Sequence, residues 1–280
     1  MIASGDIFTL VNVDEVGIHT AHVGPFVLKS TFMPVYRVSG AELRMAALVG
    51  GARFQLAGRA VDAAAVEQLP SQERARAVEL GRVLVALNRG NTGVDGLDVI
   101  MPSGDSDEMK AGSLGTVLDA GSDQVPLADF EPARLVCELP PADRTGLGSL
   151  ARHAAECRRR NVGVALRGFA GTQAAMEAVR AIRPEIVAID IRWFRQVVAM
   201  AQAARLLTPL FGSLRSMGAR VHVGGLDNSS LVGAAMTAGA DLLSGSALAG
   251  PLLAGAYLKP MSIPTEDFRR AADNIVPLFG

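Results

Sequence analysis

The second half of the chain alternates short apolar runs with segments of helical pattern. The apolar runs are nearly uninterrupted, which is typical of parallel strands buried on both faces, and they cover residues 134–139, 162–166, 186–189, 221–223 and 240–243. The helical patterns between them cover residues 149–160, 172–182, 194–217 and 230–238, where Asn228 or Ser229 can cap the last helix. Such alternation predicts right-handed crossovers and a parallel sheet with helices outside.

The first half is less regular. Residues 26–35 and 43–49 are candidates for a strand, or for a strand followed by a helix. Residues 71–87 begin as a charged helix and run into an apolar strand that ends at Asn88. Residues 91–130 are rich in Gly, Asp and Ser, so we expect an elaborated connection at the surface.

Length decides between a closed barrel and an open sheet. The chain has 280 residues, and a (β/α)8 barrel typically needs about 250. No Gly-rich phosphate-binding fingerprint follows the first convincing strand, which argues against a dinucleotide-binding sheet. We therefore predict an α/β fold of the (β/α)8 barrel type. Because barrel chemistry lies at the carboxyl ends of the strands, the candidate residues are Asn88, Glu138, Arg167, residues 188–190, Gly224 and Ser244.

Composition excludes several classes of protein. With 27 basic and 28 acidic side chains, the chain has no charge excess that would attract nucleic acid or anionic lipid. Two cysteines are too few for a disulfide framework, and the separation of Cys137 and Cys157 is not the paired spacing of a zinc site. We therefore expect reduced thiols. No signal peptide is evident, and Asp241 divides the most apolar stretch, residues 231–258. We therefore expect a cytoplasmic protein without a membrane span.

The strand-end residues resemble those of the EAL domain, the barrel phosphodiesterase that hydrolyses cyclic di-GMP. The family's DDFGTG, Lys-x-Asp, EGVE and QG motifs correspond in spacing to residues 167–172, 188–190, 224–227 and 244–245. Glu138 matches a metal-binding Glu, residues 33–35 resemble the QPI motif, and residues 46–48 stand at the signature triplet. The resemblance spans residues 28–255 and leaves an N-terminal extension, 1–27, and a C-terminal extension, 256–280.

The resemblance implies two divalent cations held by carboxylates and one Asn, with a Lys that assists the attacking water. The corresponding positions here are Ala46, Asn88, Glu138, Arg167, Gly168, Ala188, Gly224 and Asp227. Only Asn88 and Glu138 match the family's ligands, and Asp227 is a conservative change. The family's substrate contacts are replaced by Met33, Gly50 and Ser244. Because hard cations need several oxygen ligands, we expect no metal, no cofactor and no catalytic residue.

These substitutions predict a catalytically inactive EAL-type protein that acts as a bacterial signalling regulator or scaffold. Degenerate members of the family are protein-binding regulators, so the resemblance implies a protein partner, with a homodimer as one option. The main alternative is a receptor that binds cyclic di-GMP without cleaving it. A phosphodiesterase of altered specificity is a third interpretation, because fold alone does not determine function.

Three residues at the expected metal positions have specific hypotheses. Strands four and five are adjacent in a parallel barrel, so Glu138 can face Arg167 across the strand ends. We expect an ion pair there in place of the cations. Asn88, without its fellow ligands, is expected to cap backbone groups.

Four other polar residues are assigned structural roles. His222 lies within a strand and is expected to be a histidine with satisfied hydrogen bonds that faces inward or an interface. Asp190 and Asp227 are expected to have structural or loop-ordering roles rather than catalytic ones. A Ser-His-Asp triad through Ser244 is disfavoured, because no Gly-x-Ser-x-Gly elbow surrounds that serine.

Overall fold

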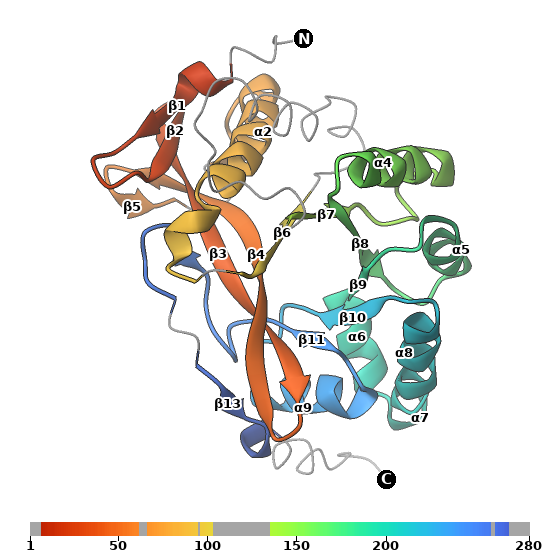
Figure 1. The fold of residues 1–280 in the computed structure, drawn as a ribbon. Helices are drawn as coiled ribbons and strands as arrows, with labels where there is room; N and C mark the ends of the chain where they lie inside the picture. The colour runs from red at the N-terminus through yellow and green to blue at the C-terminus, as the bar shows by residue number, and fades with distance from the viewer. Residues whose placement is uncertain (1–6, 62–65, 95, 103–134, 259–260, 269–280) are drawn as a thin grey trace.

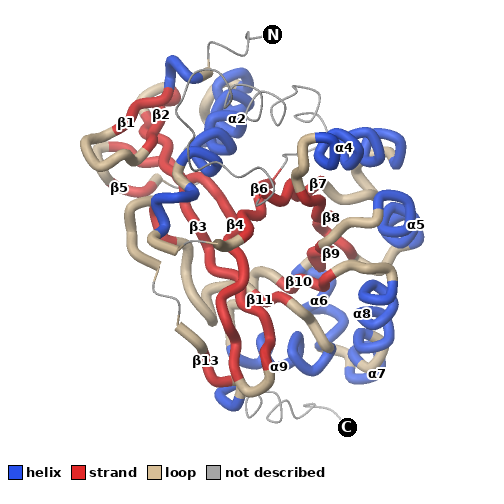
Figure 2. The backbone as a smooth tube through the Cα atoms, in the orientation of Figure 1, coloured by secondary structure: helices blue, strands red, loops and turns tan. Residues whose placement is uncertain are grey.

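Eight strands close into a barrel, as the sequence predicts. The computed structural model describes residues 7–61, 66–94, 96–102, 135–258 and 261–268. The strands follow the order β3-β11-β10-β9-β8-β7-β6-β4, and β4 pairs back with β3. Figures 1 and 2 show them as a ring at the centre of the molecule. Their bounds are β3 Phe26–Ser39, β4 Glu42–Leu56, β6 Asp98–Pro102, β7 Leu135–Leu139, β8 Gly163–Phe169, β9 Ile186–Ile189, β10 Arg220–Val223 and β11 Leu242–Leu243.

One strand runs against the others. β3 is antiparallel to both of its barrel neighbours, β4 and β11, whereas the remaining neighbours are parallel. The connection from β3 to β4 is a two-residue turn in which Gly40 has a φ of +64°. A turn this short can only join antiparallel strands, because a parallel connection needs a long crossover.

Helices cover the outside of the ring along β7 to β11 (Figure 2). Three of them begin at a side-chain cap: Thr172 accepts from Ala175 N at 3.2 Å, Asp190 from Trp193 N at 2.9 Å, and Asn228 from Leu231 N at 2.9 Å. The stretch 194–217, which is predicted to hold helical segments, contains most of α6 and the whole of α7 and α8. The bounds are α4 Leu147–Arg159, α5 Gln173–Ile182, α6 Ile191–Val198, α7 Ala201–Ala204, α8 Leu207–Ser216 and α9 Ser229–Ala238.

A layer of apolar side chains fills the barrel interior. Seven of the eight strands each contribute one residue to it: Val35, Ala47, Ile100, Val136, Ala165, Ile186 and Leu242. This layer separates the two ends of the barrel, so the polar residues one step farther along the strands are confined to the carboxyl end.

The prediction of a strand ending at Asn88 is wrong. Residues Ser71–Leu87 form one continuous helix, α2, and the strand that follows it is β6, Asp98–Pro102, inside the range expected to be a surface connection. The apolar run that suggested a strand is Val83 to Ala86, and all four of its residues are buried. A helix buried on several sides has no clear polar face, so periodicity alone cannot distinguish it from a strand.

A second, smaller core lies beside the barrel. β2 pairs with β3, and α2 packs over the part of β3 and β4 that extends past the ring (Figure 1). Leu28 from β3 and Leu80 and Leu84 from α2 are fully buried in this core. The other elements here and at the chain end are η1 Phe8–Leu10, β1 Val11–Val13, β2 His19–Val23, β5 Arg59–Ala60, η2 Arg89–Thr92, β12 Leu252–Leu253 and β13 Ile263–Pro264.

Both cysteines are free and buried, in agreement with the expectation of reduced thiols. As for membrane spans, none of the helices in the described residues is by itself long and apolar enough to cross a bilayer. Taken together, Ile191–Val198 and Ala201–Ser216 pass that test on length and composition, but the two are bent by 115° where they join.

Candidate functional site

Polar residues from neighbouring strands converge at the carboxyl end of the barrel. Glu138 is the penultimate residue of β7 and pairs in register with Ala165 of β8. Arg167 lies two residues beyond Ala165, toward the carboxyl end of β8. On the far side, His222 of β10 pairs in register with Ala188 of β9. Parallel strands therefore bring Glu138, Arg167, Ala188 and His222 to one end of the barrel, together with Ser244 directly after β11. We call these five residues the mouth group.

The charge of Arg167 acts on Glu138. Burial raises the pKa of the Glu138 carboxyl, and the Arg167 guanidinium lowers it in part. The pKa is raised overall, so the cost of removing this carboxylate from water outweighs its attraction to the guanidinium. The hypothesis that Glu138 faces Arg167 requires an interaction of this kind between them.

On the opposite side of the mouth group, a histidine is held neutral. His222 is 4% exposed, and its Nε2 lies 2.9 Å from Oγ of Ser244, which is 2% exposed. Burial lowers the pKa of His222 to about 4. Its Nδ1 is buried and has no hydrogen-bond partner among the described residues. His222 is thus buried, as predicted, but it is satisfied only at Nε2, and its pairing with Ser244 could not be derived from the sequence.

The donors of the mouth group do not fit a pair of divalent cations. Glu138 is its one carboxylate, and Arg167 places a positive charge beside it. In the part of the chain that the structure describes, no three His, Cys, Asp or Glu side chains lie close enough to hold a metal ion together. Hard cations take about six to eight oxygen ligands, so this donor set is far too small.

Two glycines stand where the EAL motifs have acidic residues, and a side chain at either would meet neighbouring atoms. Gly168 has a φ of +68°, and a Cβ there would lie 2.7 Å from Cγ of Pro141. A side chain at Gly224 would place its Cβ 3.2 Å from Oγ of Ser244 and 3.4 Å from the His222 ring. A carboxylate at either position therefore needs a rearranged backbone or a displaced His222–Ser244 pair.

The signature triplet lies at an irregularity of β4. Val35 pairs with Ala47 and Tyr36 pairs with Met45, so Ala46 is left without a cross-strand partner, as in a β-bulge. Beyond the bulge, Ala47 belongs to the interior layer. Ala46 is partly buried and packs against that layer. Neither side chain carries oxygen, so the register does not alter the donor count.

Asn88 ends a helix rather than a strand. It is the C-cap residue of α2 and is fully buried. Its Oδ1 accepts from His19 N at 2.8 Å, and its Nδ2 donates to His19 O at 2.7 Å and to Ser30 Oγ at 2.8 Å. Its placement at a strand end is therefore wrong, whereas the expectation that it caps backbone groups is correct.

The two remaining aspartates stabilise local structure. Asp190 caps α6 through Oδ1, which accepts from Trp193 N at 2.9 Å. Asp227 forms an ion pair with Arg195 at 2.6 Å, and both side chains are about half exposed. Neither contributes oxygen to the mouth group, which agrees with the loop-ordering roles expected for them.

A scan of protein-family models and a search of curated proteins both find no match to this sequence. Solved structures do resemble it. The Bacillus subtilis YkuI protein, with an EAL domain, in complex with substrate c-di-GMP and calcium, superposes with a TM-score of 0.68 at 13% identity. That match covers 87% of this chain and 59% of YkuI, so this chain spans well under two thirds of that protein.

Isolated EAL domains match over nearly their whole length. The FimX EAL domain from Pseudomonas aeruginosa, bound to c-di-GMP, has a TM-score of 0.66 at 17% identity, with 82% of this chain and 93% of that one covered. A standalone EAL protein from Vibrio cholerae, in a c-di-GMP-bound form, has a TM-score of 0.61 at 14% identity, with 80% and 92% covered. The chain therefore has the EAL-type barrel fold that the spacing of its strand-end residues predicts.

Proposed function

We propose that this EAL-type barrel is a catalytically inactive protein of cyclic di-GMP signalling that acts as a regulator or scaffold through protein contacts. The observation that carries the proposal is the donor set of the mouth group: one buried carboxylate beside a guanidinium. Metal-assisted hydrolysis of a phosphodiester needs cations that activate water and neutralise the developing charge. The mouth group offers them one carboxylate, with a guanidinium beside it.

The decisive experiment is a turnover assay with cyclic di-GMP in Mg²⁺ and in Mn²⁺, in which the linear dinucleotide product is separated by chromatography. An active EAL phosphodiesterase serves as the positive control. We expect no product above the protein-free blank at enzyme concentrations equal to substrate. Turnover that depends on Glu138 would refute the proposal.

Arg167 supports a second candidate, a receptor that binds cyclic di-GMP without cleaving it. A guanidinium is a good partner for phosphate oxygens, and several structures of the same fold hold this nucleotide. Calorimetric titration separates the two candidates. A receptor should bind with micromolar affinity, and Arg167→Met should weaken binding at least about tenfold. Arg180→Met, an exposed change on α5, is the matched control.

Protein contacts have a testable location. Met200, 55% exposed, and Leu206, 67% exposed, flank the short helix α7, where large apolar side chains meet water. Such residues are candidates for the centre of an interface. If turnover and nucleotide binding are both absent, a partner identified by cross-linking in native cells should be lost with Leu206→Glu. A partner that is retained would place the contact elsewhere.

A further inference from the structure

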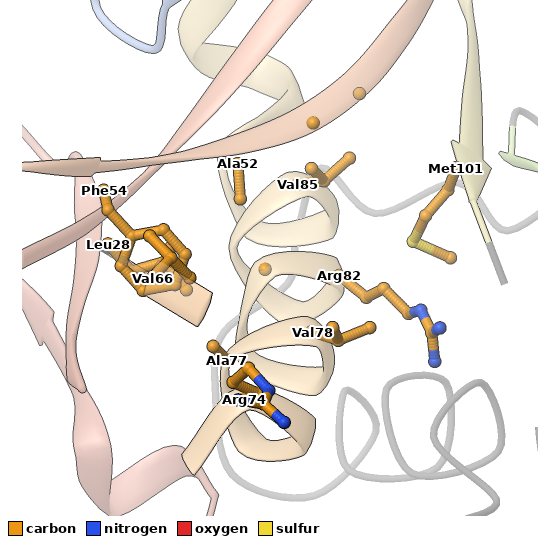
Figure 3. Close-up of a pocket in the computed structure, with 13 residues that line it drawn as sticks. Leu28, Ala52, Phe54, Val66, Arg74, Ala77, Val78, Arg82, Val85 and Met101 are labelled. Carbon is orange, nitrogen blue, oxygen red and sulfur yellow. The ribbon is translucent and has the colours of Figure 1, made fainter. Parts of the chain in front are cut away.

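A cavity of about 410 Å³ lies outside the barrel, between α2 and β4 (Figure 3). The residues of α2 that line it have spacings of three and four and so form one face of the helix: Arg74, Ala77, Val78, Gly81, Arg82 and Val85. The facing strand contributes Gly50, Gly51 and Ala52. A volume of this size falls in the range of small-molecule sites, which is roughly 300–1,000 Å³.

The cavity follows the seam between the two cores. Leu28 and Ala77 belong to the smaller core, whereas Val85 and Met101 belong to the core that surrounds the barrel. All four line the cavity. It is therefore part of neither packed interior, and it lies on the outer side of β4, opposite the interior layer that contains Ala47.

Helix α2 cannot move closer to β4 to close the cavity. A Cβ on Gly50 would lie 2.3 Å from Cγ1 of Val85, and one on Gly81 would lie 3.0 Å from Cβ of Ala52. The two backbones are thus already as close as glycine allows at these points. The small side chains that permit this approach also leave the space beside it unfilled.

The lining is apolar except for two arginines of α2. Arg74 is held at the rim, where its Nη1 donates to the carbonyls of Glu67 at 2.6 Å and Leu69 at 2.7 Å. Arg82 is 4% exposed, and Figure 3 shows it extending from α2 towards β6, on the side of Met101. A largely apolar cavity that is open on one side and has a buried guanidinium in its lining complements a ligand that has a hydrocarbon body and an anionic head.

We propose that this cavity binds a single-chain amphipathic anion, an acyl carboxylate, with its tail among the apolar side chains and its head group on Arg82. A nucleotide is a poor fit, because the lining offers few groups to hydrogen-bond with a base. The proposal does not depend on the mouth group, so it stands or falls separately from the proposed function.

The test is calorimetric titration of the full chain with decanoate and dodecanoate below their micellar concentrations. We expect saturable binding of one molecule per chain, roughly fifteenfold tighter for dodecanoate than for decanoate, because burial of two added methylenes strengthens binding about fourfold each. Arg82→Gln should weaken binding about tenfold or more, the loss expected for a charged hydrogen bond. Methyl dodecanoate, which lacks the charge, should bind the native chain as weakly as dodecanoate binds the variant.

A second variant keeps the test independent of the buried arginine. Val78→Phe fills the cavity from a partly exposed position and should abolish binding, whereas Ala75→Phe, exposed on the same helix, should not. Arg53→Gln, an exposed change on β4, is the control for charge. Binding that survives both Arg82→Gln and Val78→Phe, or that cyclic di-GMP displaces stoichiometrically, would overturn the proposal.

Discussion

Acidification should destabilise this protein because the folded chain keeps a proton away from His222. The unfolded chain binds that proton with a pKa near 6.5, the ordinary value, whereas burial lowers the pKa in the folded chain to about 4. Above pH 6.5 both states hold a neutral imidazole. Below it, His222 is protonated in the unfolded chain but stays neutral in the folded chain. The free energy of unfolding therefore falls as the pH falls.

The size of the effect follows from the two values. A difference of about 2.5 units corresponds to about 3 kcal/mol once the pH is below both pKa values. About 2 kcal/mol of this is lost between pH 7.5 and pH 5, a range in which most surface carboxylates stay ionised. The raised pKa of Glu138 acts in the opposite direction, because that carboxyl is protonated more readily in the folded chain.

A comparison of the native chain with His222→Gln isolates the contribution of this histidine to the pH dependence of stability. Urea unfolding, followed by fluorescence of the single tryptophan, Trp193, is measured at pH 7.5, 6 and 5 for the native chain and for His222→Gln. Glutamine cannot titrate and can still hydrogen-bond to Ser244. The native chain should lose about 2 kcal/mol more than the variant across this range. Equal losses in the two chains would show that His222 is not held neutral by burial.

Three further predictions concern single side chains. Gly168→Ala should cost about 1–3 kcal/mol in urea unfolding, since its φ of +68° and the nearby Pro141 penalise a Cβ. Asp190→Ala should cost about 1 kcal/mol by removing the cap of α6, and Asp190→Asn should restore most of it. Asn88→Ala should cost about 2–4 kcal/mol, because it leaves partly buried backbone groups of His19 and the buried hydroxyl of Ser30 without their partner.

Each of these has an outcome that contradicts it. Gly148→Ala, at an exposed helical position with open space around it, should be neutral or slightly stabilising, and a similar cost there would remove the argument from φ at Gly168. A cost for Asp190→Asn as large as that for alanine would point to the charge rather than the cap. An Asn88→Ala chain as stable as the native one would contradict the buried network.

Most elements of the second half could be predicted because each depends on a local pattern. Buried parallel strands need continuous apolar runs, and residues 186–189 were predicted with the bounds that β9 has. Caps are equally local, as at Asn228. In the first half the pattern was ambiguous, because α2 is buried against strands on more than one side and its apolar run mimics a strand.

The composition of the candidate site is a property of the sequence, whereas its geometry is not. That Ala46, Arg167, Gly168, Ala188 and Gly224 carry no carboxylate is evident without a structure. Spacing alone also puts Asn88 at a strand end, and this fails because residues 71–87 form one helix, so that Asn88 caps the helix and binds Ser30 of β3 instead.

By itself, the sequence determined the alternation of strands and helices, the barrel class and the atoms that the strand ends can offer to a ligand. These follow from period, length and residue type, all of which are properties of neighbouring positions along the chain. Only the tertiary structure decided that Asn88 binds His19, that His222 meets Ser244, and that α2 stands off β4 over a cavity. Such contacts join residues far apart in the chain, and they depend on packing distances that no local pattern contains.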